Sequence, residues 1–159
     1  MNAKMPELKR AFESAGFTDV RTVLSSGNVV FSSPRKSTPA LEAIGEAAMR
    51  KQLGREFLTI VRSIHELEKL LGTDPYRPFG SRTGAKRVVT FLRDAPRTKL
   101  TLPVEADGAR ILAVNERAVF VDYVPSPKGR GAAFMVVIER AFGKQVTTRT
   151  WETVKKVAR

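Results

Sequence analysis

Apolar residues at the start of the chain recur every three to four positions, which predicts an amphipathic helix. Over residues 5–15, one helical face collects the apolar side chains Met5, Leu8, Phe12 and Ala15. Pro6 suits the first turn of this helix and Gly16 suits its end. The chain therefore opens on a helix with one buried face.

The pattern then changes to short apolar runs separated by turn residues. We predict strands at 19–25 and 29–33, joined by a turn at Ser26-Gly27-Asn28, because Gly and Asn tolerate positive φ. Later elements of this half are a helix from Thr38 to Gly54, a strand at 56–62 and a short helix that Ser63 opens and Gly72 closes. The first half thus mixes helices and strands.

Residues 73–85 are rich in Gly, Pro, Asp, Arg and Ser, and they form the predicted linker. Beyond them, the apolar runs predict strands at 87–92, 110–114 and 118–123, a helix or turn at 96–102, a loop at 125–131, a helix that ends at Gly143 and a last helix from Trp151. The second half repeats the order of the first.

Strands interleaved with helices and hairpins predict an α+β protein with antiparallel sheets. Each half contains most of a β-α-β-β-α-β unit, so we predict two ferredoxin-like subdomains in tandem. The first subdomain, with a trailing helix, spans residues 1–72 and the second, with a C-terminal helix, spans residues 86–159. The halves share this order of elements and negligible sequence identity.

Composition narrows the class of protein. The chain has 159 residues, 42% of them hydrophobic, and no cysteine. Zero cysteines exclude disulfides, thiolate zinc sites, iron–sulfur clusters and thiol nucleophiles. No apolar run is long enough for a spanning helix and no apolar signal core follows Met1. We therefore expect a soluble cytoplasmic protein.

The net charge of +12 is unevenly spread. Residues 1–80 have a net charge of +3 and residues 81–159 have a net charge of +9. A half this basic attracts polyanions such as nucleic acids. The alternative is a basic surface that keeps the protein in solution and binds nothing in particular.

Several basic and polar positions are candidates for binding an anion, and each has a structural alternative. The loop at 126–131 carries Lys128 and Arg130 between glycines just before a helix, which resembles a phosphate cradle in chemistry. It lacks the P-loop pattern, and the alternative is a plain loop. Ser26 and Asn28 are candidates through hydroxyl and backbone N–H groups, and the alternative is a hairpin turn.

The remaining candidates lie in the basic half. Arg149 beside Trp151 can clamp a base or a phosphate, although a lone tryptophan near a terminus more often anchors the last helix. The predicted strand at 87–92 is surrounded by a cluster of basic residues, which are Lys86, Arg87, Arg93, Arg97 and Lys99. This cluster is the best footprint for a polyanion.

Catalytic chemistry has little support in the sequence. His65 is the single histidine and is expected on the exposed face of a helix. One histidine without cysteine excludes a His/Cys metal cluster, and no nucleophile elbow accompanies the serines. We predict no catalytic residue, no metal site and no cofactor, and we lean towards a protein that is not an enzyme.

Two segments resemble the bacterial family called domain of unknown function 1697. One is Phe12-x-x-x-Gly16-Phe17-x-x-Val20-x-Thr22 followed by Ser26-Gly27-Asn28-Val29-Val30-Phe31, and the other is Thr148-Arg149-x-Trp151-x-Thr153-Val154. The resemblance implies two ferredoxin-like subdomains and gives no activity. Family members usually begin with a further strand. The resemblance therefore implies that the first subdomain lacks its N-terminal strand here. We expect that the true start lies upstream or that the chain is only marginally folded. Members of the family that this chain resembles often have Asn on both sides of the C-terminal tryptophan, where this chain has Thr150 and Glu152.

Three functions remain open. The first is a binding module for nucleic acid or a phosphorylated ligand. The second is an interaction domain whose unpaired sheet edge takes a strand from another chain or from a second copy, giving a homo-oligomer. The third is an enzyme acting on a small anionic metabolite. We expect no membrane partner.

Overall fold

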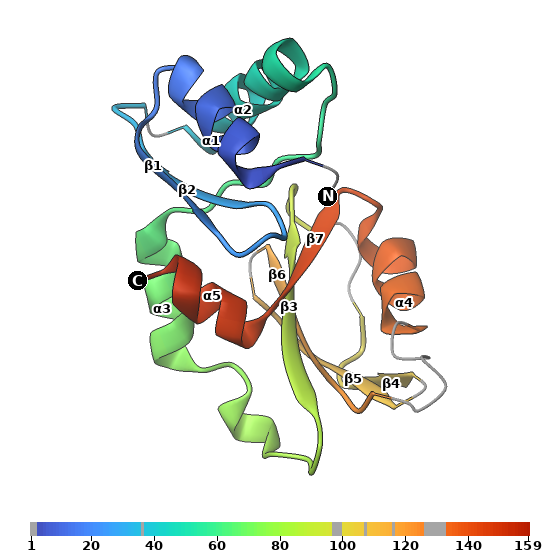
Figure 1. The fold of residues 1–159 in the computed structure, drawn as a ribbon. Coiled ribbons are helices and arrows are strands. Elements are labelled where there is room, and N and C mark those ends of the chain that lie inside the picture. Colours follow the sequence, from blue (N-terminus) through green and yellow to red (C-terminus); the bar gives the residue numbers. More distant parts are fainter. Residues whose placement is uncertain (1–2, 36, 97–99, 107, 116, 126–132) are drawn as a thin grey trace. The chain divides into compact units, whose positions relative to one another are not determined.

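The computed structural model describes residues 3–35, 37–96, 100–106, 108–115, 117–125 and 133–159. Among them it contains five α-helices, one short 3-10 helix, a two-stranded sheet and a five-stranded sheet. The chain divides into two compact units (Figure 1). Unit 1 comprises residues 1–63 with Arg159, and unit 2 comprises residues 64–158. The predicted α+β class is confirmed, and the tandem ferredoxin-like arrangement stays a prediction.

Unit 1 packs two helices against a β-hairpin. Its elements are α1 (Met5–Ser14), β1 (Thr18–Val23), β2 (Asn28–Ser32) and α2 (Thr38–Leu53). Helix α2 ends as predicted, because Gly54 adopts φ 70°. The core of the unit centres on a cluster of three rings, in which Phe17 stacks on Phe31 at 4.3 Å and Phe12 lies 5.7 Å from each.

The strand predicted at 56–62 is wrong. These residues run outside any sheet, and two of their amides bond to glutamate side chains of α2. The Thr59 N–H donates to Glu46 Oε2 at 3.2 Å, and the Val61 N–H donates to Glu42 Oε2 at 3.0 Å. The apolar residues of this segment predicted a half-buried strand. In the structure, the carboxylates of Glu42 and Glu46 accept the hydrogen bonds that a neighbouring strand would otherwise accept from these amides.

Unit 2 is built around one antiparallel sheet with the order β4-β5-β6-β3-β7. Its strands are β3 (Lys86–Leu92), β4 (Val104–Ala106), β5 (Ala109–Asn115), β6 (Ala118–Tyr123) and β7 (Val146–Thr150). The sequence predicted β3, β5 and β6. It missed β4, which has three residues, and β7, which is polar and lacks an apolar alternation.

Helices cover both faces of this sheet (Figure 1). On one face α4 (Ala133–Phe142) packs Phe134 and Ile138 against Val119 and Val121. On the other face lies α5 (Trp151–Val157), which contacts α3 (Ile64–Thr73). The predicted linker at 73–85 contains the 3-10 helix η1 (Arg77–Phe79) and Tyr76, which is only 1% exposed.

Candidate functional site

A row of alternating charges crosses four strands of unit 2. The strand register sets Glu105 of β4 opposite Arg110 of β5, Arg110 opposite Asp122 of β6, and Asp122 opposite Arg87 of β3. Directly opposite residues of antiparallel strands project from the same face of a sheet. The four side chains therefore form one row, which we call the charge row.

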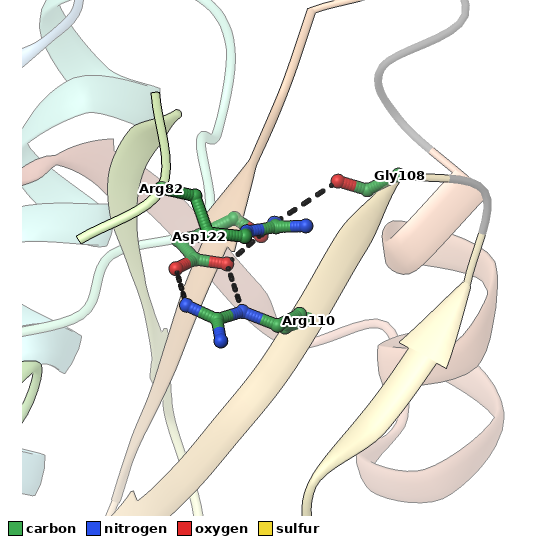
Figure 2. Close-up of polar contacts among 4 residues, drawn as sticks. All are labelled: Arg82, Gly108, Arg110 and Asp122. Carbon is green, nitrogen blue, oxygen red and sulfur yellow. Dashed lines mark hydrogen bonds and ion pairs between the residues drawn. The ribbon is translucent and has the colours of Figure 1, made fainter. Parts of the chain in front are cut away.

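Asp122 is the centre of the charge row. It is 3% exposed, although it lies on a strand whose other members are mostly apolar. Arg110 donates from Nε to Asp122 Oδ1 at 3.0 Å and from Nη2 to Oδ2 at 2.5 Å, so the pair is bidentate (Figure 2). A planar guanidinium fits a carboxylate in this geometry, which also fixes the direction of the arginine.

Arg82 approaches the same carboxylate from the loop that precedes β3. Its Nη2 donates to Asp122 Oδ1 at 2.6 Å and to the carbonyl oxygens of Gly108 at 3.1 Å and Asp122 at 3.3 Å (Figure 2). Its Nε is buried and has no hydrogen-bond partner within the described residues. The loop is therefore held to the sheet by one guanidinium that joins Asp122 of β6 to Gly108, the residue before β5.

The arginines govern the ionisation of Asp122. Burial by itself raises the pKa of this carboxyl, but the hydrogen bonds and positive charges of Arg110 and Arg82 outweigh burial and hold the pKa below its usual value. Asp122 in turn raises the pKa of Arg110 through the same hydrogen bonds. Asp122 and Arg110 thus form an ion pair near neutral pH, and with Arg82 the formal net charge of the cluster is +1.

Arg87 adds a second positive charge beside this cluster. Its guanidinium carbon lies 5.1 Å from the centre of the Tyr76 ring, a cation–π distance. The Tyr76 hydroxyl donates to the Val88 carbonyl, and burial raises the pKa of this hydroxyl well above its usual value. Tyr76 therefore serves as a neutral, buried support for Arg87.

Behind Arg87 lies an aromatic cluster that supports this face of the sheet. Tyr76 meets Trp151 at 5.1 Å and Phe120 at 5.7 Å, both edge to face, and Phe120 meets Trp151 at 6.2 Å. The exposed fractions of the three side chains are 1%, 5% and 0% in the order Tyr76, Trp151, Phe120. Their rings are consequently buried too deeply for a base to stack on them.

The candidates predicted from sequence fall in different places. Lys86 is exposed at the start of β3 and Arg87 is half-buried within the charge row. Arg149 of β7 is opposite Val89, one row away from Arg87, and its Nη1 donates to Thr147 Oγ1 at 2.7 Å and the Thr148 carbonyl at 2.9 Å. Burial lowers the pKa of Arg149.

Trp151 begins α5 directly after β7 and belongs to the aromatic cluster. Thr150 caps this helix, because its Oγ1 accepts from the Thr153 N–H at 3.2 Å. Thr150 therefore has a structural role as the N-cap of α5. Lys128 and Arg130, together with the whole loop at 126–131, lie outside the described residues, as do Arg97 and Lys99.

Ser26 and Asn28 lie in the hairpin of unit 1. The Asn28 amide donates from Nδ2 to the Val23 carbonyl at 3.0 Å and to Ser26 Oγ at 2.8 Å. These bonds close the turn between β1 and β2, with Gly27 at φ 92°. Ser26 and Asn28 thus have the structural role of stabilising a hairpin turn.

Sequence reasoning missed Arg82, Arg110 and Asp122. Arg110 and Asp122 are separated by twelve positions, and only the hairpin register places them opposite each other. One available signal was the aspartate itself, since a charged residue inside the apolar run 118–123 is expected to have a partner. Among the described residues, no group of three or more His, Asp or Glu side chains is placed to hold a metal ion.

Comparison with known proteins identifies the family. A family described as "Protein of unknown function (DUF1697)" matches residues 1–120. No curated protein matches the chain significantly. A solved structure of a conserved bacterial protein from Streptococcus pneumoniae has a similar fold, with a TM-score of 0.69 and 17% sequence identity over 99% of this chain and 88% of that one. In the described residues, no helix has the length and apolar character needed to cross a membrane. By the family match over most of its length, the chain belongs to the DUF1697 family.

Proposed function

We propose that unit 2 binds a phosphorylated ligand through Arg82, Arg87 and Arg110. The observation that carries the proposal is the single carboxylate of Asp122 at the centre of these arginines. Asp122 and Glu105, which lies opposite Arg110, together neutralise two of the three guanidinium groups, so the site keeps a net charge of +1. Such an excess of guanidinium groups, held in fixed directions, favours phosphate oxygens.

The free donors of the arginines support the proposal. Arg110 uses Nε and Nη2 on Asp122, and Arg82 uses Nη2 on Asp122 and two carbonyls. Within the described residues, Nη1 of each has no hydrogen-bond partner. The two side chains are 17% and 31% exposed, so water reaches both. Each arginine is thus anchored at one side and keeps N–H groups for a ligand.

The burial of the aromatic rings favours a phosphate group over a nucleic-acid strand. Proteins that bind single strands stack bases on exposed aromatic side chains, whereas Tyr76, Phe120 and Trp151 are all buried. Contact with phosphate needs only the arginines. We therefore expect the strongest interaction with compact phosphorylated ligands.

Two broader expectations remain part of the proposal. The antiparallel order β5-β6-β3-β7 supports a ferredoxin-like arrangement for unit 2. A function in the cytoplasm is the second expectation, and it is compatible with a chain that has no cysteine and so needs no oxidising compartment to form disulfides.

Calorimetric titration with inorganic pyrophosphate at constant ionic strength tests the proposal. The wild type should bind in a saturable way, and Arg87→Gln should weaken binding about ten-fold or more, because a hydrogen bond to a charged group contributes about 1.5–3 kcal/mol. Arg140→Gln is the matched control, since Arg140 is exposed on α4, which covers the opposite face of the sheet. It should bind as the wild type does.

Two results would contradict the proposal. One is an absence of saturable pyrophosphate binding by the folded wild type. The other is an equal loss in Arg87→Gln and Arg140→Gln, which would mean that net charge alone attracts the anion. A parallel anisotropy titration with labelled single-stranded RNA separates the alternatives. Binding to RNA that survives physiological salt without any binding to pyrophosphate would instead assign a nucleic-acid module.

A further inference from the structure

The charge row ends in an exposed carboxylate, that of Glu105 on the edge strand β4. The strand register sets Glu105 opposite Arg110, but Arg110 directs its hydrogen bonds to Asp122 on its other side. Within the described residues, the Glu105 carboxylate accepts no hydrogen bond and forms no ion pair. The row therefore has a negative charge at its end that a ligand can reach.

Glu105 acts on Arg110 through its charge. Hydrogen bonds to Asp122 are the largest cause of the raised pKa of Arg110, and the negative charges of Asp122 and Glu105 add to it. Directly opposite residues of antiparallel strands have Cβ atoms about 4.5–5.5 Å apart. A phosphate that binds Arg110 therefore comes close to Glu105, and like charges at such a distance repel each other.

The charge balance of the site indicates which ligand avoids this repulsion. Three arginines and two carboxylates give the site a net charge of +1. A phosphorylated hydroxyl carries a charge of about −1.5 to −2 near pH 7, so a simple phosphate monoester more than neutralises the site. One ammonium group on the same ligand brings its net charge close to −1, and Glu105 is the carboxylate that this ammonium would meet.

We propose that the anion site of unit 2 takes a small phosphate monoester that also carries a primary ammonium group. The phosphate contacts Arg82 and Arg110, and the ammonium contacts Glu105. This inference rests on the proposed phosphate site and adds the second half of its ligand. Because neighbouring strands are about 4.8 Å apart, the two charged groups of the ligand are separated by roughly one to two strand spacings.

The buried aromatic rings favour a primary ammonium over a quaternary one. Proteins recognise quaternary ammonium groups by cation–π contact inside cages of aromatic rings. On this face of the sheet, Tyr76, Phe120 and Trp151 are buried, and Arg87 already lies over the Tyr76 ring. A carboxylate such as that of Glu105 suits a primary ammonium instead, since this group has three N–H donors.

Calorimetric titrations with O-phosphoethanolamine and ethyl phosphate at constant ionic strength test the inference, because the two ligands differ only in the ammonium group. The wild type should bind O-phosphoethanolamine about three-fold more tightly, which is within the range that exposed ion pairs contribute. Phosphocholine should bind less tightly than O-phosphoethanolamine. Equal binding of these two amines would overturn the choice of a primary ammonium.

Glu105→Gln should abolish the preference for the amine. Ethyl phosphate should bind more tightly, because the repulsion from the carboxylate is gone, and the ratio of the two dissociation constants should fall to about one. Glu139→Gln is the matched control, since Glu139 is exposed on α4, which covers the opposite face of the sheet. It makes the same change in net charge and should keep the ratio of the wild type.

The outcomes separate this inference from the proposed function. If pyrophosphate binds while O-phosphoethanolamine binds no more tightly than ethyl phosphate, the inference is overturned and the anion site stands. A ratio that is the same in Glu105→Gln and the wild type also overturns the inference, and would mean that Glu105 only keeps the edge strand β4 from pairing with other chains. If the folded wild type does not bind pyrophosphate, the proposed site fails and the inference fails with it.

Discussion

The two units satisfy the backbone of their extended segments in different ways. In unit 2, five strands bond to one another in a continuous antiparallel ladder. Among the described residues of unit 1, two strands pair, and the extended segment at 57–61 bonds to Glu42 and Glu46 of α2. The comparison shows that a buried carboxylate can substitute for a neighbouring strand, and that such a segment depends on individual side chains.

The units also differ in the use of buried charge. The buried carboxylates of unit 1 accept backbone N–H groups, whereas the buried carboxylate of unit 2 accepts from two guanidinium groups. Of the arginines of unit 1, Arg62 is half-buried and the others are exposed. Unit 2 gathers arginines on one face of a rigid sheet, which is the arrangement a phosphate site needs.

The largest expected effect is on the aromatic cluster of unit 2. Trp151→Ala should lower the free energy of unfolding by about 3–5 kcal/mol, because it leaves a cavity between Tyr76 and Phe120. Urea unfolding followed by circular dichroism measures the change. Val136→Ala, at a side chain that is 54% exposed, should change stability by less than about 0.5 kcal/mol. Similar losses in both variants would show that the cluster does not support the sheet.

The second prediction concerns Asp122. Asp122→Asn should lower the free energy of unfolding by about 2–4 kcal/mol at pH 7, because it leaves Arg82 and Arg110 next to a neutral amide. Chemical unfolding at several pH values measures it. Since the native pKa of Asp122 lies below the ordinary value of 3.8, the stability it contributes is complete above that value. It is then lost as the pH falls through the lowered native pKa.

The difference in the free energy of unfolding between the wild type and Asp122→Asn should therefore be constant near neutral pH and should become smaller only in acid. Asp94→Asn serves as the control, because Asp94 is exposed and begins a loop. If this difference in the free energy of unfolding became smaller as the pH rises from 5 to 8, the assigned ionisation of Asp122 would be contradicted.

A smaller effect is expected in unit 1. Glu46→Ala should lower the free energy of unfolding by about 1–3 kcal/mol, because it removes the acceptor for the partly buried amide of Thr59. Glu46→Gln keeps an oxygen acceptor and should cost less. Glu56→Ala removes an exposed ion pair with Arg50 and should cost about 0–1 kcal/mol. Amide exchange of Thr59 reports the local effect, and unchanged protection in Glu46→Ala would show that the carboxylate does not hold this segment.

Local patterns were sufficient to predict most helices and the long strands. Apolar periodicity identified α1 and the buried strands β3, β5 and β6, and Gly54 marked the end of α2. The apolar residues at 56–62 predicted a strand, because a half-buried extended segment has the same pattern whatever its backbone bonds to. Here the backbone amides bond to glutamate side chains of α2 instead of a neighbouring strand. The polar strand β7 was missed because its threonines and Arg149 carry no apolar alternation.

The candidate site was harder to predict than the fold. Arg87 was identified from the local cluster of positive charge, but Arg82, Arg110 and Asp122 come together only through the register of β5 with β6 and the path of the loop before β3. Net charge indicated the basic half of the chain. It could not indicate which arginines share a carboxylate, because that depends on pairing between distant positions.

The central claim is that a phosphate group binds Arg82, Arg87 and Arg110 around Asp122 in unit 2 and no other basic surface. The most direct test is a titration with pyrophosphate at constant ionic strength, followed by NMR of the backbone amides and arginine side chains. The account predicts saturable shifts at Arg82, Arg87 and Arg110, with little change at the Ser26–Asn28 turn of unit 1. Shifts spread evenly over the lysines and arginines of both units, or largest at the turn, would contradict it.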